Sequence, residues 1–163
     1  MGASAAVMVL AATGVGHAEP VNEPRAAAEL LINSSGKCLE IENSSTANGA
    51  KAQQWTCVGQ SGAYWKTVPA GSPAEFWIVN AKSGKCLEVE NGWKHNGAPV
   101  QQWTCTPGVK HQLWMGAGPR PGGAAIMNSG TGKFLEVENS SGANGARVQH
   151  WQYAQVSGQA WRD

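Results

Sequence analysis

The chain has 163 residues, which suits one domain, and 42% of them are hydrophobic, enough for a packed core. The formal net charge is only +1 and 14% of the residues are charged, so no basic field exists for nucleic acid or anionic lipid. Eight Trp against two Tyr and two Phe form a lopsided aromatic set, and indoles suit both cores and surfaces where an apolar face meets polar groups.

The N-terminal segment is typical of a secretory signal. It is uncharged and mostly apolar from Ala5 to Val15 and leads to Gly16-His17-Ala18, a small-x-small cleavage pattern, although no basic residue precedes the apolar run. We predict a signal peptide over residues 1–18 and a linker over residues 19–27. The apolar run is shorter than the roughly 20 residues that span a bilayer, so we expect a secreted protein without a membrane anchor.

An internal repeat dominates residues 28–163. The segment that begins Gly-Lys-Cys-Leu-Glu at Gly36 recurs at Gly84 and, with Phe for Cys, at Gly132. Apolar residues alternate with others in each copy, which predicts a strand, and an Asn-Gly hairpin signal separates it from a second run containing Gln-x-Trp. The chain is predicted to be all-β. Three copies are too few for a propeller, so we expect a β-trefoil with repeats at about 28–75, 76–123 and 124–163.

The four cysteines flank the first two Asn-Gly loops. Of the three possible connectivities, only pairing within a repeat fits a hairpin, which predicts disulfides Cys38–Cys57 and Cys86–Cys105. Disulfides imply an oxidising compartment. The alternative, a zinc site, is not expected because neither the cysteine spacing nor the four His match a zinc pattern.

The cysteine pairing also predicts which side chains face each other. If Cys38 lies opposite Cys57, antiparallel geometry places Glu40 opposite Trp55, and Glu42 opposite Gln53. In the other copies the same rule pairs Glu88 with Trp103, Glu90 with Gln101, Glu136 with Trp151, Glu138 with Gln149, and Phe134 with Tyr153. One face of each hairpin is thus predicted to carry a carboxylate, an indole and an amide.

The three copies of Gly-Lys-Cys-Leu or Gly-Lys-Phe-Leu, Asn-Gly and Gln-x-Trp resemble the ricin-B lectin family, which includes carbohydrate-binding modules of bacterial glycoside hydrolases. The resemblance covers roughly residues 28–163 and implies a β-trefoil with up to three shallow pockets. It further implies that the acidic residue two after the first Cys accepts hydrogen bonds from sugar hydroxyls, and that the aromatic residue two before the second Cys stacks on the sugar. A pyranose suits this set because it has an apolar C–H face and a polar rim.

The candidate sugar-binding residues combine that acid and indole with the strand amide and the polar residues before the last Trp of a repeat. They are Glu40, Gln53 and Trp55 in the first copy, Glu88, Gln101, Trp103, His111 and Gln112 in the second, and Glu136, Gln149, Trp151 and Gln159 in the third. A competing interpretation makes the repeated indoles core residues, but Trp65, Trp114 and Trp161 suit that task better. Glu42, Glu90 and Glu138 are expected at a solvated strand edge.

Two departures from the family pattern bear on binding. The family usually has Asp where this chain has Glu, which moves the carboxylate one methylene outward. The first copy has Gly62-Ala63 where the family has an Asn-Gln pair, and so is expected to lack a polar flank. We therefore rank the second pocket strongest, with Trp93 beside it, the third weaker and the first nearly silent.

Three function classes compete. A binding module or lectin for galactose- or xylose-type glycans fits the threefold sameness, since several weak sites on one rigid domain raise avidity. An enzyme is not expected, because glycoside hydrolysis needs two carboxylates in different environments, whereas these acids are copies of one Glu-x-Glu strand. The alternative is a protein-binding or inhibitor-type trefoil that has lost sugar binding, which the Glu-for-Asp change favours. We expect a monomer with no cofactor, no metal and no nucleic-acid or membrane partner.

Overall fold

The computed structural model describes residues 27–163, which form strands, 3-10 turns and loops. The predicted signal peptide, residues 1–18, and all of the predicted linker except Ala27 lie outside the described residues. Within the described part, no helix is long and apolar enough to cross a membrane. The strands are β1 (Glu29–Leu30), β2 (Ile32–Asn33), β3 (Cys38–Ile41), β4 (Ala52–Trp55), β5 (Tyr64–Ala70), β6 (Ser72–Asn80), β7 (Cys86–Val89), β8 (Val100–Trp103), β9 (Trp114–Arg120), β10 (Gly123–Asn128), β11 (Phe134–Val137), β12 (Val148–Trp151) and β13 (Trp161–Arg162).

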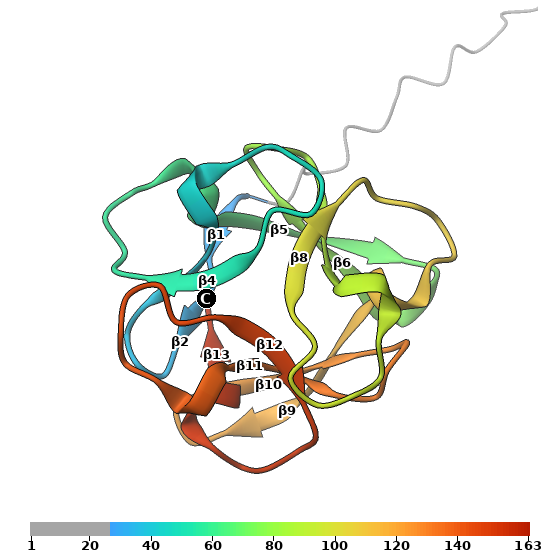
Figure 1. Cartoon of the computed structure of the whole chain (residues 1–163). Coiled ribbons are helices and arrows are strands. Elements are labelled where there is room, and N and C mark those ends of the chain that lie inside the picture. The colour runs from blue at the N-terminus through green and yellow to red at the C-terminus, as the bar shows by residue number, and fades with distance from the viewer. Residues whose placement is uncertain (1–26) are drawn as a thin grey trace, which may run out of the picture.

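The strands are arranged as three lobes around a central axis, as Figure 1 shows. Six neighbours in the order β1-β5-β6-β9-β10-β13 form the barrel, and β2 pairs with β13 to close it. The antiparallel hairpins β3–β4, β7–β8 and β11–β12 belong one to each lobe, with β4, β8 and β12 around the axis. The predicted all-β class and the β-trefoil are confirmed.

The core is built from the repeated apolar positions of the strands. Leu39, Leu87 and Leu135 are fully buried, and their backbone carbonyls accept the indole N–H of Trp65, Trp114 and Trp161 at 2.9 to 3.0 Å. These indoles are at most 4% exposed, so the prediction that they belong to the core is confirmed. Each satisfies its only polar group, as a buried Trp requires.

Each repeat contains two 3-10 turns. They are η1 (Glu42–Ser44), η2 (Ser61–Ala63), η3 (Glu90–Gly92), η4 (Lys110–Gln112), η5 (Glu138–Ser140) and η6 (Ser157–Gln159). The first turn of each pair carries an Asn in the left-handed region, with φ between 52° and 56° at Asn43, Asn91 and Asn139. Asn tolerates this conformation better than most residues, so the repeated Glu-Asn pair ends the strand there.

The Asn-Gly pairs lie between the paired strands, as predicted, but only Gly adopts a left-handed conformation, with φ of 81° at Gly49. The Asn side chain instead connects neighbouring repeats. Oδ1 of Asn48 accepts the backbone N–H of Thr104 at 3.0 Å, and Asn96 and Asn144 make the same contact to Gln152 and Thr56. The three loops therefore link the repeats in a closed ring.

The predicted register of the hairpins is wrong by two residues. Cys38 lies opposite Trp55, and Glu40 lies opposite Gln53, so Glu40 does not face Trp55 and Glu42 does not face Gln53. The other hairpins repeat the correction, with Glu88 opposite Gln101 and Glu136 opposite Gln149. Glu42, Glu90 and Glu138 lie beyond the strands, at the start of 3-10 turns.

The disulfides explain the error. Cys57 lies two residues past the end of β4 and reaches back to Cys38 with 5.3 Å between Cα atoms, and Cys86 joins Cys105 in the same way. A disulfide can form without its cysteines being ladder partners, so it does not fix the register. A shift of two residues keeps every side chain on its predicted face, because the strand period is two.

Candidate functional site

Three equivalent pockets lie where each hairpin meets the second 3-10 turn of its repeat. Their volumes are about 190, 300 and 330 Å³ in the first, second and third repeats. The shared lining is a carboxylate and an amide from the paired strands and an indole from the strand end: Glu40, Gln53 and Trp55; Glu88, Gln101 and Trp103; Glu136, Gln149 and Trp151. The structure thus brings together the residues that the repeat predicts.

A buried carboxylate lies at the base of each pocket. Glu40, Glu88 and Glu136 are no more than 5% exposed. One oxygen of each accepts the strand amide, at 2.8 Å from Gln53, 2.9 Å from Gln101 and 3.1 Å from Gln149. The corrected register accounts for these bonds, since side chains directly opposite on antiparallel strands are the closest pairs.

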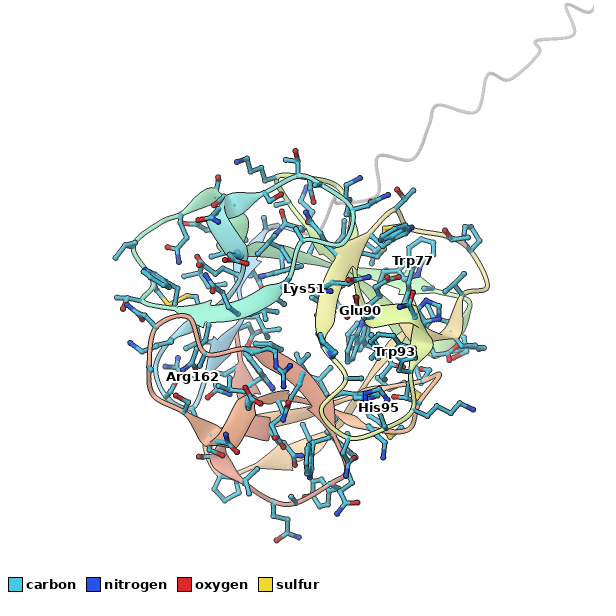
Figure 2. All side chains as sticks on the ribbon, in the orientation of Figure 1. Lys51, Trp77, Glu90, Trp93, His95 and Arg162 are labelled. Atoms are coloured by element: carbon cyan, nitrogen blue, oxygen red, sulfur yellow. A yellow bond between two sulfur atoms is a disulfide. The ribbon has the colours of Figure 1, made fainter. Side chains whose placement is uncertain are left out.

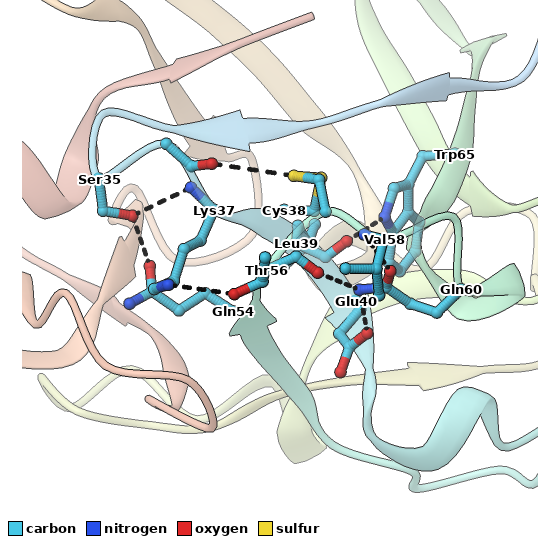
Figure 3. The surroundings of a disulfide bond; sticks show 12 residues. Ser35, Lys37, Cys38, Leu39, Glu40, Gln54, Thr56, Val58, Gln60 and Trp65 are labelled. Carbon is cyan, nitrogen blue, oxygen red and sulfur yellow. Dashed lines mark hydrogen bonds between the residues drawn. A yellow bond between two sulfur atoms is a disulfide. The ribbon is translucent and has the colours of Figure 1, made fainter.

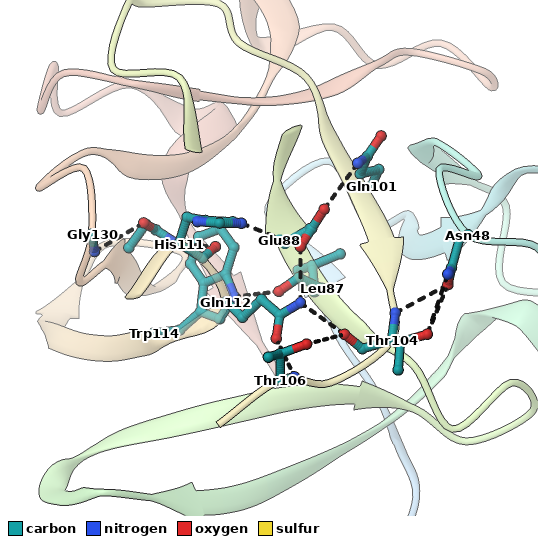
Figure 4. A network of polar contacts seen from close by, with 11 residues as sticks. Asn48, Leu87, Glu88, Gln101, Thr104, Thr106, His111, Gln112, Trp114 and Gly130 are labelled. Carbon is teal, nitrogen blue, oxygen red and sulfur yellow. Dashed lines mark hydrogen bonds and ion pairs between the residues drawn. The ribbon is translucent and has the colours of Figure 1, made fainter. Parts of the chain in front are cut away.

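A second amide holds the other oxygen. Gln112 donates to Glu88 at 2.9 Å, and Gln159 donates to Glu136 at 2.8 Å (Figure 4 for the second repeat). The carbonyl of each amide accepts a backbone N–H of the preceding loop, from Thr106 or Ala154. Gln112 and Gln159 are at most 1% exposed, so they hold the carboxylate in place and offer little surface of their own to a ligand.

The first repeat has the same second amide, and it comes from a residue that sequence reasoning missed. Gln60 donates to the free oxygen of Glu40 at 2.7 Å and accepts the backbone N–H of Val58, as Figure 3 shows. Gln60 lies directly before η2, whereas Gln112 and Gln159 end their turns. The expectation that this copy lacks a polar flank is therefore wrong: a Gln between Cys57 and the last Trp of the repeat was the available signal.

The three pocket indoles lie at the surface. Trp55 and Trp103 are 39% and 43% exposed, and Trp151 is half-buried. The competing interpretation, that these indoles belong to the core, is therefore wrong. Trp114, by contrast, is enclosed and donates a hydrogen bond to the backbone, as a core indole does. A partly exposed indole beside a fixed carboxylate presents an apolar face next to hydrogen-bond acceptors.

The second pocket has a large side chain, His111, that the others lack. His111 places Nε2 3.5 Å from a carboxylate oxygen of Glu88, and it packs so closely on Gly92 that a Cβ there would lie 2.9 Å from Nδ1. The other repeats reverse this arrangement, with Gly158 donating its N–H to Ser140 Oγ at 3.0 Å in the third. In each of these two repeats, a glycine in one 3-10 turn therefore makes room for a larger side chain from the other turn.

Comparison with known protein families matches residues 22–103 and 110–163 to the ricin-type β-trefoil lectin domain-like family. The chain belongs to this family. Comparison with curated proteins finds no match.

Solved structures agree with this assignment. The lectin domain is similar to ThreeFoil, a designed threefold symmetric protein, with 34% identity and a TM-score of 0.78 over 83% of this chain and 96% of that one. An exo-β-1,3-galactanase from Clostridium thermocellum is 31% identical with a TM-score of 0.79 over 85% of this chain, which spans 30% of the galactanase chain. The Rhizoctonia solani agglutinin, 21% identical with a TM-score of 0.75 over 88% and 97% of the two chains, shares the fold. Relatives of this lectin domain thus include a part of an enzyme.

Burial shifts two titratable groups of the lectin domain. It raises the pKa of the Glu136 carboxyl, although the amides of Gln149 and Gln159 oppose the shift. It lowers the pKa of His150, which replaces the Gln of the other repeats and contacts the carbonyl of His95 at 2.8 Å. Among residues 27–163, no group of three or more His, Cys, Asp or Glu side chains could hold a metal ion.

Proposed function

We propose that this lectin domain binds carbohydrate, with one sugar ring in each of the three pockets. The observation that carries the proposal is the repeated set of a clamped carboxylate, an amide and a partly exposed indole. Each carboxylate oxygen accepts one amide bond and keeps a further lone pair for a sugar hydroxyl. The indole offers its flat face to the C–H side of a pyranose.

The amide contacts of the Glu carboxylates remove the argument that the Glu-for-Asp change gave for a protein-binding trefoil. Two amides hold each carboxylate at hydrogen-bond distance, so the extra methylene does not leave it loose. Binding sites depend on such supporting contacts to keep polar groups in place. Each of the three acids also accepts the same pair of amide donors, whereas glycoside hydrolysis needs two acids of different character.

Galactose- and xylose-type glycans are the ligands we propose to test, with the domain acting as a monomer outside the cell. Two disulfides support an oxidising compartment. Several shallow sites on one rigid domain favour polymers and clustered glycans through avidity.

The experiment is affinity electrophoresis of the secreted protein in gels containing galactan or xylan, followed by calorimetric titration with galactose and xylose. The matched control is the triple variant Trp55→Ala, Trp103→Ala and Trp151→Ala, whose changes lie at the surface. We expect retardation by one polysaccharide and its loss in the triple variant. Equal migration of both proteins in every gel and no titration heat would contradict the proposal.

A further inference from the structure

Six of the eight Trp residues belong to threefold sets, and Trp77 and Trp93 do not. Trp77 lies in β6, three positions before Asn80, whose amide donates to a backbone carbonyl in the way that Asn33 and Asn128 do. The positions three before those residues hold Leu30 and Ala125. The trefoil therefore does not require an indole at this place.

Trp77 lines a groove of about 470 Å³ between the β5–β6 turn and the loop that precedes η4. The apolar part of the lining includes Pro69, Pro107 and Leu113, and a charged pair lies in the same groove. Lys110 Nζ is 3.2 Å from both carboxylate oxygens of Glu75. An indole beside a carboxylate and an ammonium offers the same kind of chemistry as the three pockets: one flat apolar surface next to hydrogen-bonding groups.

The charged pair is also specific to this groove. Lys110 opens η4, and the turns of the other repeats, η2 and η6, open with Ser61 and Ser157. The groove thus combines an indole and an ion pair that the threefold pattern does not contain.

Trp77 also differs from the core indoles in its hydrogen bonding. Trp65, Trp114 and Trp161 each donate to a backbone carbonyl, whereas the buried Nε1 of Trp77 has no partner among the described residues. An unpaired buried donor is costly to the fold and needs an explanation. Trp77 therefore lacks the hydrogen bond that anchors the three core indoles to the backbone.

The groove and the second pocket share a wall. The loop between β8 and η4 turns Thr106 and Val109 toward the pocket and Pro107 and Gly108 toward the groove. That wall is the single loop 106–109, whose residues line one cavity or the other. A glycan with one residue in the pocket can therefore cross the loop and place another residue on Trp77.

We infer that the Trp77 groove is an extension subsite that binds a further sugar residue of a glycan held in the second pocket. The inference rests on the proposed function and deepens it: the second pocket recognises a chain, whereas the other two recognise single residues. Figure 2 shows Trp77 in the lobe of the second repeat, together with Trp93, which lies outside the groove and does not line the second pocket.

The test isolates the second pocket in the background Trp55→Ala and Trp151→Ala. Calorimetry then compares galactose with β-1,3-galactotriose, and xylose with β-1,4-xylotriose. We expect the trisaccharide of the bound series to bind about tenfold tighter than its monosaccharide, a typical contribution of one aromatic contact. Trp77→Ala should remove this advantage and leave monosaccharide affinity unchanged.

Trp93→Ala is the matched control, because it removes the other singular indole from the same lobe, and it should change neither affinity. Glu75→Gln, which keeps the side-chain size, should weaken only the trisaccharide and serves if Trp77→Ala does not fold. Equal affinity for the two sugars, equal losses for both in Trp77→Ala or in the Glu75 variant, or the same loss in Trp93→Ala would overturn the subsite alone. No binding of any sugar by the unmodified protein would overturn the proposed function, and the subsite with it.

Discussion

Replacing Gln60 with Ala tests whether the first pocket is built like the other two. The amide of Gln60 donates to Glu40 at 2.7 Å and to the carbonyl of Thr56 at 3.1 Å, and it accepts the N–H of Val58 at 2.9 Å. The substitution removes all three bonds and leaves Glu40 with one amide donor. The carboxylate then loses the contact that fixes its second oxygen.

The expected magnitude follows from burial. A hydrogen bond to a charged group contributes about 1.5 to 3 kcal/mol net. Gln60 is half-buried and Val58 is 70% exposed, so water replaces part of the lost bonding. The lower value of about 1.5 kcal/mol applies, which corresponds to a loss of about tenfold in affinity at this pocket.

The assay needs the first pocket alone, which the background Trp103→Ala and Trp151→Ala provides. Calorimetric titration with the monosaccharide that the unmodified protein binds gives the affinity before and after Gln60→Ala. Gln112→Ala and Gln159→Ala form the comparison set. Because these two amides are fully buried, each change should also lower the free energy of unfolding by about 3 kcal/mol, measured by urea denaturation.

Two results would refute this reasoning. If the background protein binds no sugar while the unmodified protein does, the first pocket is silent despite Gln60, as expected from Gly62-Ala63 in place of the Asn-Gln pair. If it binds and Gln60→Ala leaves the affinity unchanged, the second amide does not support the carboxylate. Either result would mean that the contact between Gln60 and Glu40 does not make the first pocket bind sugar.

Three further changes probe the fold and the site. Trp114→Ala should destabilise the domain by about 3 to 5 kcal/mol in urea, whereas Trp103→Ala should cost under about 1 kcal/mol and remove sugar binding at the second pocket only; the reverse order of stability losses would exchange their roles. Replacing Cys38 and Cys57 together with Ala should cost about 3 kcal/mol, and an unchanged melting temperature would contradict it. Burial depresses the pKa of His150, so the stabilisation from the neutral ring is present above pH 6.5 and is lost as pH falls through the lowered pKa. Between pH 7.5 and pH 5 the melting temperature of His150→Gln should therefore fall less than that of the unmodified protein, and parallel curves would disprove the assignment.

The repeat in the sequence was enough to predict the trefoil, because strand period, Asn-Gly loops and copy number constrain the topology together. It also placed the pocket residues on the correct face. A two-residue error in register preserves the face of a strand, so the predicted grouping of Glu40, Gln53 and Trp55 did not depend on the incorrect pairing.

The partner of Glu40 could not be predicted from alignment of the copies. Gln112 and Gln159 precede the last Trp of their repeats by two positions, and the same position in the first repeat holds Ala63. Gln60 reaches the same carboxylate oxygen from the residue before the 3-10 turn, since a side-chain amide depends on where its chain passes in space. Alignment of the repeats compares equivalent positions only, so it misses an amide that another position of the same repeat supplies.

The singular residues explain how a threefold domain can bind asymmetrically. A carboxylate with two amides occurs in every repeat, so it accounts for what the pockets share and for no difference between them. His111 lies 3.5 Å from Glu88, and Trp77 lies across one loop from the same pocket, both in the second lobe. Because a domain distinguishes ligands only through contacts that one ligand makes and another lacks, the proposed selectivity between a single sugar and a chain would depend on these unrepeated side chains.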